Sequence, residues 1–221
     1  MTYYYAETDG KVYLIDKDGR LSFPSSRSEL PFQIKERQMM NFEGNQIMYC
    51  TPLLEQHPRH WVNKDRIPFL DEADPMVRKA INCTFPRLVV EAVIMNKGEV
   101  LLVMPKRGFS KGGWTLPGGF MIYGESPEEG VKREAREEIG ADVQPERFLN
   151  LHSHMGQGND YQWIIFYYLT RLSTGKQDIK PNHEIKKLDW FDASQVPQLL
   201  VSPLMAHGFQ EILDEDMLEL P

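Results

Sequence analysis

Cysteine is scarce in this sequence: its 221 residues include only two, Cys50 and Cys83. Two cysteines are too few for a disulfide framework or for a zinc ribbon with four cysteine ligands. A chain that forms no disulfides suits a reducing compartment, so we expect a cytoplasmic protein.

Long apolar stretches are also missing. No run approaches the roughly 20 residues that a helix needs to cross a bilayer. Residues 1–10 do not combine a basic region with an apolar core, as an export signal does. The sequence therefore predicts neither a membrane partner nor export.

Positive charge is in deficit, because 25 lysines and arginines face 32 aspartates and glutamates, a formal net charge of -7. A surface that binds nucleic-acid backbones usually gathers lysine and arginine, so we expect no nucleic-acid partner. A small anionic substrate remains compatible with this charge. Acidic residues that bind cations would account for part of the imbalance.

The pattern of residues changes near Pro86, and we place a boundary between domains 1–85 and 86–221 there. In the first domain, Asp18 and Gly19 suit a hairpin turn, and Asp74 suits the N-cap of a short helix. The elements expected are a β-hairpin, two strands and that helix, over residues 11–23, 30–40, 46–54 and 75–82. The first domain is therefore predicted to be small and mainly β.

The second domain shows stronger patterns. Strands are expected over residues 88–95, 99–104, 148–155, 162–171 and 188–191. One helix has a clear start, with Ser126 as its N-cap and Glu129 completing a capping box, and Gly140 is placed to end it. Ser202 and Pro203 open a closing helix. Strands and helices mix without regular alternation, which favours an α/β sandwich with a mixed sheet over a doubly wound parallel fold.

The carboxylates of the first helix are phased. At about 100° per residue, Glu134, Glu137 and Glu138 fall within an arc of roughly 100°, next to an apolar stripe. Like charges at these spacings destabilise a helix by about 0.2–0.5 kcal/mol per pair, so the cluster calls for a compensating cation. Magnesium prefers oxygen ligands, and Arg133 could orient one of the glutamates.

These residues complete a family pattern. The box runs from Gly119 to Ala141: glycine, five residues, glutamate, seven residues, then Arg-Glu-U-x-Glu-Glu-x-Gly-U, where U is apolar. Its fixed positions are filled by Gly119, Glu125, Arg133, Glu134, Glu137, Glu138 and Gly140. From Pro86 onward the chain therefore resembles the Nudix hydrolase superfamily, with an additional N-terminal domain and no assigned subgroup.

The resemblance implies a fold and a metal site. The fold is a Nudix-type α/β/α sandwich, and the metal is Mg²⁺, with Mn²⁺ as an alternative. The implied ligands are Glu134, Glu137, Glu138 and the carbonyl of Gly118. Glu184 stands six residues before Trp190 and is a further candidate, as metal ligand or general base.

The resemblance also implies a mechanism, in which a water activated by the metal attacks phosphorus. Glu184 or Glu134 would take the proton, while Arg133 orients a glutamate. Candidate contacts to substrate are Lys106 and Arg107 for phosphate, Tyr123 for a base, and His154 for phosphate or ribose. A solvated strand end, core packing of the aromatic ring and an ordinary surface histidine are the simpler readings of these residues.

Signatures of several subgroups are missing. No Ser-Gln-Pro-Trp-Pro-Phe-Pro stretch follows the box, and Gln157 stands where many ADP-ribose hydrolases have proline. The expected substrate is a nucleoside diphosphate linked to another group, such as ADP-ribose or a sugar nucleotide, ahead of a nucleoside triphosphate. Some relatives use an extra N-terminal domain to build a dimer whose partner completes the pocket, so a homodimer is expected by analogy.

Two other functions remain open. A Nudix-like domain can sense nucleotides and regulate a partner without turnover. The complete set of box glutamates and the lack of a basic DNA-binding helix favour the enzyme. Residues 1–85 could also serve as a protein-interaction module that carries the catalytic domain.

Overall fold

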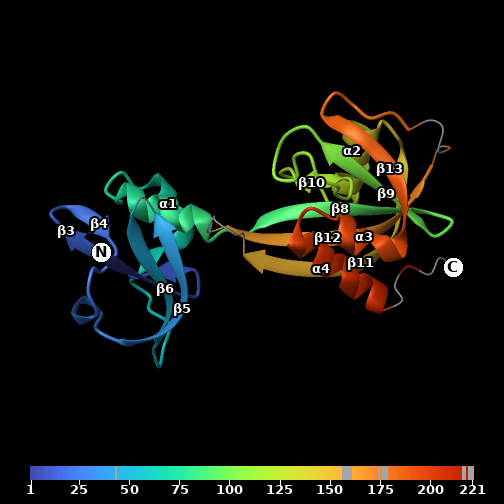
Figure 1. Cartoon of the computed structure of the whole chain (residues 1–221). Helices are drawn as coiled ribbons and strands as arrows, with labels where there is room; N and C mark the ends of the chain where they lie inside the picture. The colour runs from blue at the N-terminus through green and yellow to red at the C-terminus, as the bar shows by residue number, and fades with distance from the viewer. Residues whose placement is uncertain (43, 156–160, 174, 176–178, 216–217, 219–221) are drawn as a thin grey trace. The chain divides into compact units, whose positions relative to one another are not determined.

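The computed structural model describes residues 1–42, 44–155, 161–173, 175, 179–215 and 218 (Figure 1). The chain divides into two compact units, Met1–Pro86 with Met155–Gln162 and Arg87–His154 with Trp163–Pro221. Gln157, which stands where many ADP-ribose hydrolases have proline, lies outside the described residues. No helix in the described part is long and apolar enough to cross a membrane.

The first unit is rich in strands. Its main sheet has the order β5-β6-β1-β2-β7, and β3 pairs with β4. The bounds are Thr2–Thr8 (β1), Lys11–Val12 (β2), Ile15–Lys17 (β3), Arg20–Ser22 (β4), Gln33–Phe42 (β5), Asn45–Leu53 (β6) and Val62–Asn63 (β7). The hairpin expected around Asp18 and Gly19 is confirmed, since both residues have positive φ, 53° and 80°.

The described part of this unit also has the α-helix Pro75–Cys83 (α1) and the short 3-10 helices Arg27–Glu29 (η1) and Lys64–Phe69 (η2). Asp74 caps α1 as expected, because its side chain accepts a hydrogen bond from the backbone N–H of Met76. The core is aromatic and aliphatic, with Tyr5 stacked on Phe23 at 4.9 Å between ring centroids. The expectation of a mainly-β N-terminal part is therefore confirmed.

Both cysteines are buried in the first unit. Burial, with a smaller contribution from the charge of Glu36, raises the pKa of the Cys50 thiol to about 12. Only the thiolate attacks a disulfide reagent, so this thiol is almost entirely in its unreactive form at pH 8.

We predict that Cys50 in the folded protein resists an aromatic disulfide reagent at pH 8 and becomes labelled when a denaturant unfolds the chain. Peptide mass spectrometry after quenching would identify the labelled residue. Rapid labelling of Cys50 under native conditions would show that the β1–β6 region is not packed as described.

The second unit is built on a mixed sheet of order β11-β12-β8-β9-β13, with β10 paired to β8. Strands β8 and β12 run parallel, whereas β8 pairs antiparallel with β9 and β10. The bounds are Arg87–Asn96 (β8), Glu99–Pro105 (β9), Gly118–Phe120 (β10), Val143–Met155 (β11), Gln162–Leu172 (β12) and Ile185–Asp192 (β13). All the strands expected here are present, and β10 is additional.

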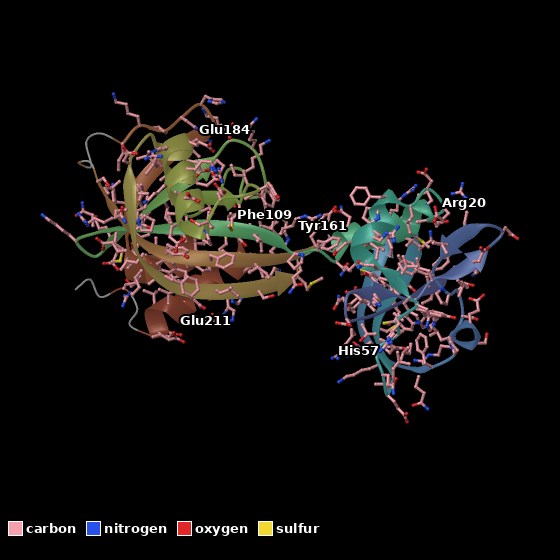
Figure 2. All side chains as sticks on the ribbon, turned by 180° about the vertical axis from the view of Figure 1, so that it is seen from behind. Arg20, His57, Phe109, Tyr161, Glu184 and Glu211 are labelled. Atoms are coloured by element: carbon pink, nitrogen blue, oxygen red, sulfur yellow. The ribbon has the colours of Figure 1, made fainter. Side chains whose placement is uncertain are left out.

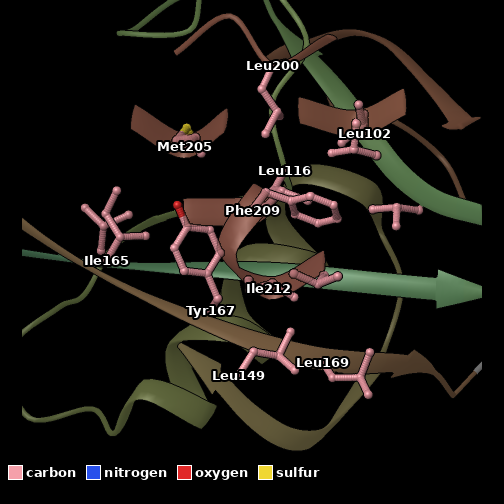
Figure 3. Packing of buried hydrophobic residues seen from close by; sticks show 14 residues of the cluster. Leu102, Leu116, Leu149, Ile165, Tyr167, Leu169, Leu200, Met205, Phe209 and Ile212 are labelled. Atoms are coloured by element: carbon pink, nitrogen blue, oxygen red, sulfur yellow. The ribbon is translucent and has the colours of Figure 1, made fainter. Parts of the chain in front are cut away.

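Helices cover both faces of this sheet (Figure 1). They are Pro127–Ile139 (α2), Val196–Leu199 (α3), Pro203–Asp214 (α4) and the 3-10 helix Ala193–Gln195 (η4). On one face Val131, Ala135 and Ile139 of α2 pack against β8 and β9. On the other face Phe209 and Ile212 of α4 pack against side chains of the sheet, as Figure 3 shows. The expected α/β sandwich with a mixed sheet is confirmed.

Candidate active site

The helix α2 begins with the capping box that the sequence predicts. The backbone N–H of Ser126 donates to Glu129 Oε2 at 2.7 Å, and the N–H of Glu129 donates to the Ser126 hydroxyl oxygen at 3.3 Å. At the other end, Gly140 adopts φ 64°, a left-handed conformation that costs glycine little. Both ends of the helix are thus fixed by local interactions.

The last turn of α2 is joined to the short strand β10. The N–H of Gly118 donates to Glu138 Oε2 at 3.1 Å. On its other edge β10 pairs with β8, with Gly118 opposite Glu91 and Gly119 opposite Val90. The backbone of β10 therefore lies between the carboxylates of the helix and the central strand of the sheet.

Arg133 connects most of the remaining box residues. Its guanidinium donates to both oxygens of Glu125, at 2.7 and 3.0 Å, to Glu134 Oε1 at 2.7 Å and to Glu137 Oε2 at 3.1 Å. It also donates to the carbonyl of Phe120 at 2.8 Å. One arginine therefore orients several glutamates, as the sequence predicted for one of them.

The two glycines of β10 allow the close approach of these groups. A Cβ built on Gly119 would lie 2.6 Å from Glu134 Oε1. A Cβ on Gly118 would lie 2.2 Å from the carbonyl oxygen of Val90. A larger residue at either glycine would therefore displace a carboxylate or the neighbouring strand.

Burial makes the ionised form of these acids unfavourable. Desolvation raises the pKa of Glu138 to about 8, helped by the charges of Glu134 and Glu137 and opposed by the hydrogen bond from Gly118. Desolvation also raises the pKa of Glu134, although Arg133 lowers it. A nearby cation would favour the charged forms of both carboxylates.

These residues fit a divalent cation in their chemistry. Glu134 and Glu138 are hard oxygen donors held in a poorly solvated environment, beside a glycine whose carbonyl belongs to an edge strand. Within the described ranges, no three His, Cys, Asp or Glu side chains already stand in an arrangement suited to an ion. Arg133 holds Glu134 and Glu137 by ion pairs instead.

Glu184 precedes β13 in a segment that is tied to the end of α2. The N–H of Asn182 donates to the carbonyl of Glu138 at 3.0 Å, and the Asn182 amide also donates to the carbonyl of Glu137. Glu184 itself forms an ion pair with Arg107. Figure 2 shows Glu184 on the α2 side of the sheet and Glu211 on the opposite side, on α4. The structure thus places Glu184 near the box helix.

The other proposed substrate contacts are dispersed. The Lys106 ammonium donates to the carbonyl of His183 at 2.8 Å, close to Glu184. Tyr123 is fully exposed in the loop before α2. His154 lies on β11, where its Nε2 is buried and has no hydrogen-bond partner among the described residues, and burial lowers its pKa. The structure brings Lys106 and Arg107 to Glu184 but gives Tyr123 no described contact with the box.

The family model of the NUDIX domain matches residues 85–212, more than half of the chain. The chain belongs to the NUDIX domain family. The matched range contains the capping box, the glycine pair and the glutamates of α2.

Curated relatives of this NUDIX chain include an ADP-ribose pyrophosphatase of Methanocaldococcus jannaschii, 29% identical over 114 residues, which are 52% of this chain and 66% of the relative. An 8-oxo-dGDP phosphatase of Danio rerio, NUDT18, is 31% identical over 147 residues, 65% of this chain and 41% of the relative. The chain thus spans less than two thirds of either relative.

A solved structure of a MutT protein from Methanosarcina mazei aligns with a TM-score of 0.52 at 24% identity, over 59% of this chain and 96% of that one. At this level of identity the likeness concerns the fold. It agrees with the α/β sandwich of the second unit of the NUDIX chain.

Sequence reasoning missed several residues of this NUDIX domain. Glu91 is buried on β8, opposite Gly118, and no motif marks it. Trp163 on β12 contacts Phe120 and Phe109, with ring centroids 5.3 and 6.3 Å apart. Asn182 joins the segment before β13 to α2. Strand pairing brings Glu91 and Trp163 to the box, and hydrogen bonds to the end of α2 bring Asn182 there.

The glycine pair gives a matched prediction. Gly118→Ala should lower the free energy of unfolding by about 1–3 kcal/mol, because its Cβ meets the backbone of β8. Gly119→Ala should cost less than about 1 kcal/mol, because the end of the Glu134 side chain can move. Urea denaturation of both variants measures the difference. Equal losses would contradict the described register of β10.

Proposed function

We propose that this chain is a Nudix pyrophosphohydrolase that requires a divalent cation, Mg²⁺ with Mn²⁺ as a substitute. Its substrate would be a nucleoside diphosphate linked to another group, with ADP-ribose or a sugar nucleotide favoured over a nucleoside triphosphate. The proposal rests above all on one observation, the buried carboxylates of Glu134 and Glu138 gathered at the glycine backbone of β10.

Each box residue has a part in this proposal. Glu134, Glu137, Glu138 and the carbonyl of Gly118 would hold the cation, which supplies an activated water and neutralises charge on the substrate's phosphates. Arg133 fixes the direction of Glu134 and Glu137. Glu184 or Glu134 would accept the proton from the attacking water.

The substrate's phosphates need positive charge at the mouth of the site. Arg107 and Lys106 stand beside Glu184 at the end of β9 and supply it. When substrate binds, Arg107 would leave Glu184 and bind a phosphate of the substrate instead. The carboxylate of Glu184 would then be free to act as the base.

An aromatic cluster supports a substrate that carries a base. Phe109 and Phe120 are exposed, and both rings lie next to Trp163. The carbonyl of Phe120 accepts a hydrogen bond from Arg133, so the cluster adjoins the carboxylates. Exposed aromatic faces stack on nucleobases. The names of the two curated relatives, for ADP-ribose and 8-oxo-dGDP, agree with a nucleoside diphosphate part in the substrate.

We predict that Trp163→Ala raises KM for a nucleotide substrate about 5-fold or more with a smaller change in kcat, because stacking is worth about 1–3 kcal/mol per base. Steady-state kinetics on the preferred substrate would measure it. Trp163→Phe is the matched control and should retain most of the affinity. An unchanged KM in Trp163→Ala would remove this cluster from the site.

The decisive test is a panel of nucleotide derivatives incubated with Mg²⁺, scored for phosphate, pyrophosphate and mononucleotide. We expect ADP-ribose or a sugar nucleotide to be cleaved into two monophosphates. Glu138→Gln should lower kcat more than about 100-fold, since even loss of a residue that only supports a metal ligand costs about 10–100-fold.

Glu138→Gln should also keep or increase stability without metal, because it removes a buried acid that repels its neighbours. Glu146→Gln is the control, since Glu146 forms only a surface ion pair with Arg171 on the described chain. No turnover of any compound by the parent protein, or full activity of Glu138→Gln, would refute the hydrolase.

The first unit and the environment of the protein complete the proposal. Residues 1–85 would form a separate domain that builds a homodimer. The small number of cysteines supports a cytoplasmic location, and the net charge of -7 supports the absence of a nucleic-acid partner. Sedimentation equilibrium of the full chain, with and without substrate, measures the oligomeric state.

The competing function is a nucleotide sensor without turnover. It would bind the same compounds through the same aromatic cluster and phosphate-binding side chains. The complete carboxylate set favours the enzyme, because a sensor has no need of buried acids that repel one another. Binding without product in the nucleotide panel would identify the sensor.

A further inference from the structure

Glu91 is a buried acid on the central strand of the second unit. It stands on β8 between Gly118 of β10 and Tyr167 of β12, its partners on either edge. Only 5% of its surface is exposed, and its Oε2 has no hydrogen-bond partner in the part of the chain that the structure describes. A buried carboxylate without a partner is unfavourable, and an apolar side chain would avoid this cost.

The side chain of Glu91 occupies the space that Gly118 leaves open. A Cβ on Gly118 would lie 2.6 Å from Glu91 Oε2. The N–H of the same glycine donates to Glu138 Oε2 at 3.1 Å. Two carboxylates, one from the sheet and one from the helix, therefore approach Gly118: Glu91 lies where a side chain would be, and Glu138 accepts the backbone N–H.

A purely structural role explains Glu91 poorly. Tyr167, its neighbour on β12, also has a buried hydroxyl with no hydrogen-bond partner among the described residues, so the two residues do not satisfy each other. That hydroxyl lies close to α4, where a Cβ on Gly208 would be 2.9 Å from it. Figure 3 shows Tyr167 packed among apolar members of the core cluster.

We infer that Glu91 is an additional carboxylate of the divalent-cation site, contributed by the sheet and directed to the cation beside Gly118 and Glu138. This inference rests on the proposed function, because it assumes a cation at the box. Glu91 then gains the positive partner that its burial demands, and cation binding joins β8, β10 and α2.

The test measures binding of Mn²⁺ alone to the full chain stripped of metal, by electron paramagnetic resonance of free Mn²⁺ and by the rise in thermal unfolding temperature. Glu91→Gln keeps the shape of the side chain and removes its charge. We expect the Mn²⁺ affinity to fall about 10-fold or more. The rise in unfolding temperature on adding Mn²⁺ should shrink correspondingly.

Tyr167→Phe is the matched control, because it removes the other buried polar group without a partner from the same row of the sheet. Its Mn²⁺ affinity should equal that of the parent. Should Glu91→Gln fail to fold by circular dichroism, Glu91→Met replaces it, since an unbranched apolar side chain fits a largely apolar environment.

Glu138→Gln separates failure of this inference from failure of the proposed function. Lower Mn²⁺ affinity in both Glu91→Gln and Glu138→Gln supports the inference. Lower affinity in Glu138→Gln alone overturns it and leaves the hydrolase standing. No Mn²⁺ binding by the parent protein overturns both.

Discussion

The contact between Gly118 and Glu138 is the interaction on which the second unit depends. It brings the last turn of α2 against an edge of β10, where the two successive glycines leave room for the side chains of Glu91 and Glu134. The capping box fixes the start of the helix, so the position of every carboxylate on α2 follows from two ends that are separately anchored. Backbone geometry therefore places the carboxylates, and their charges act from the positions that it sets.

One residue neutralises part of the negative charge of these glutamates. Arg133 binds Glu125, Glu134 and Glu137, yet burial still raises the pKa of Glu134 and Glu138 above the usual range. This combination suits a site that must accept a cation: the glutamates are oriented in advance, and the repulsion that remains is relieved when positive charge arrives. Without a cation, the repulsion between these buried glutamates lowers the stability of this part of the domain.

The two faces of the mixed sheet have different tasks. The face under α2 packs Val131, Ala135 and Ile139 on the sheet and holds the helix that carries the box. The face under α4 provides the main core, and its exposed margin carries the rings of Phe109, Phe120 and Trp163. Because side chains alternate along a strand, the short strand β10 contacts both faces: Gly119 adjoins Glu134 of α2, and the next residue, Phe120, contacts Trp163.

The sequence by itself determined what is encoded locally: the ends of α2, the spacing of its glutamates, the hairpin turns and the family. Capping, helical phase and turn conformation depend on neighbours within a few residues, so they can be read directly. Only the tertiary structure revealed β10, whose glycines have low strand propensity and become a strand through pairing with β8. It also brought Glu91 and Trp163 to the site, because register between strands distant in sequence decides which side chains meet.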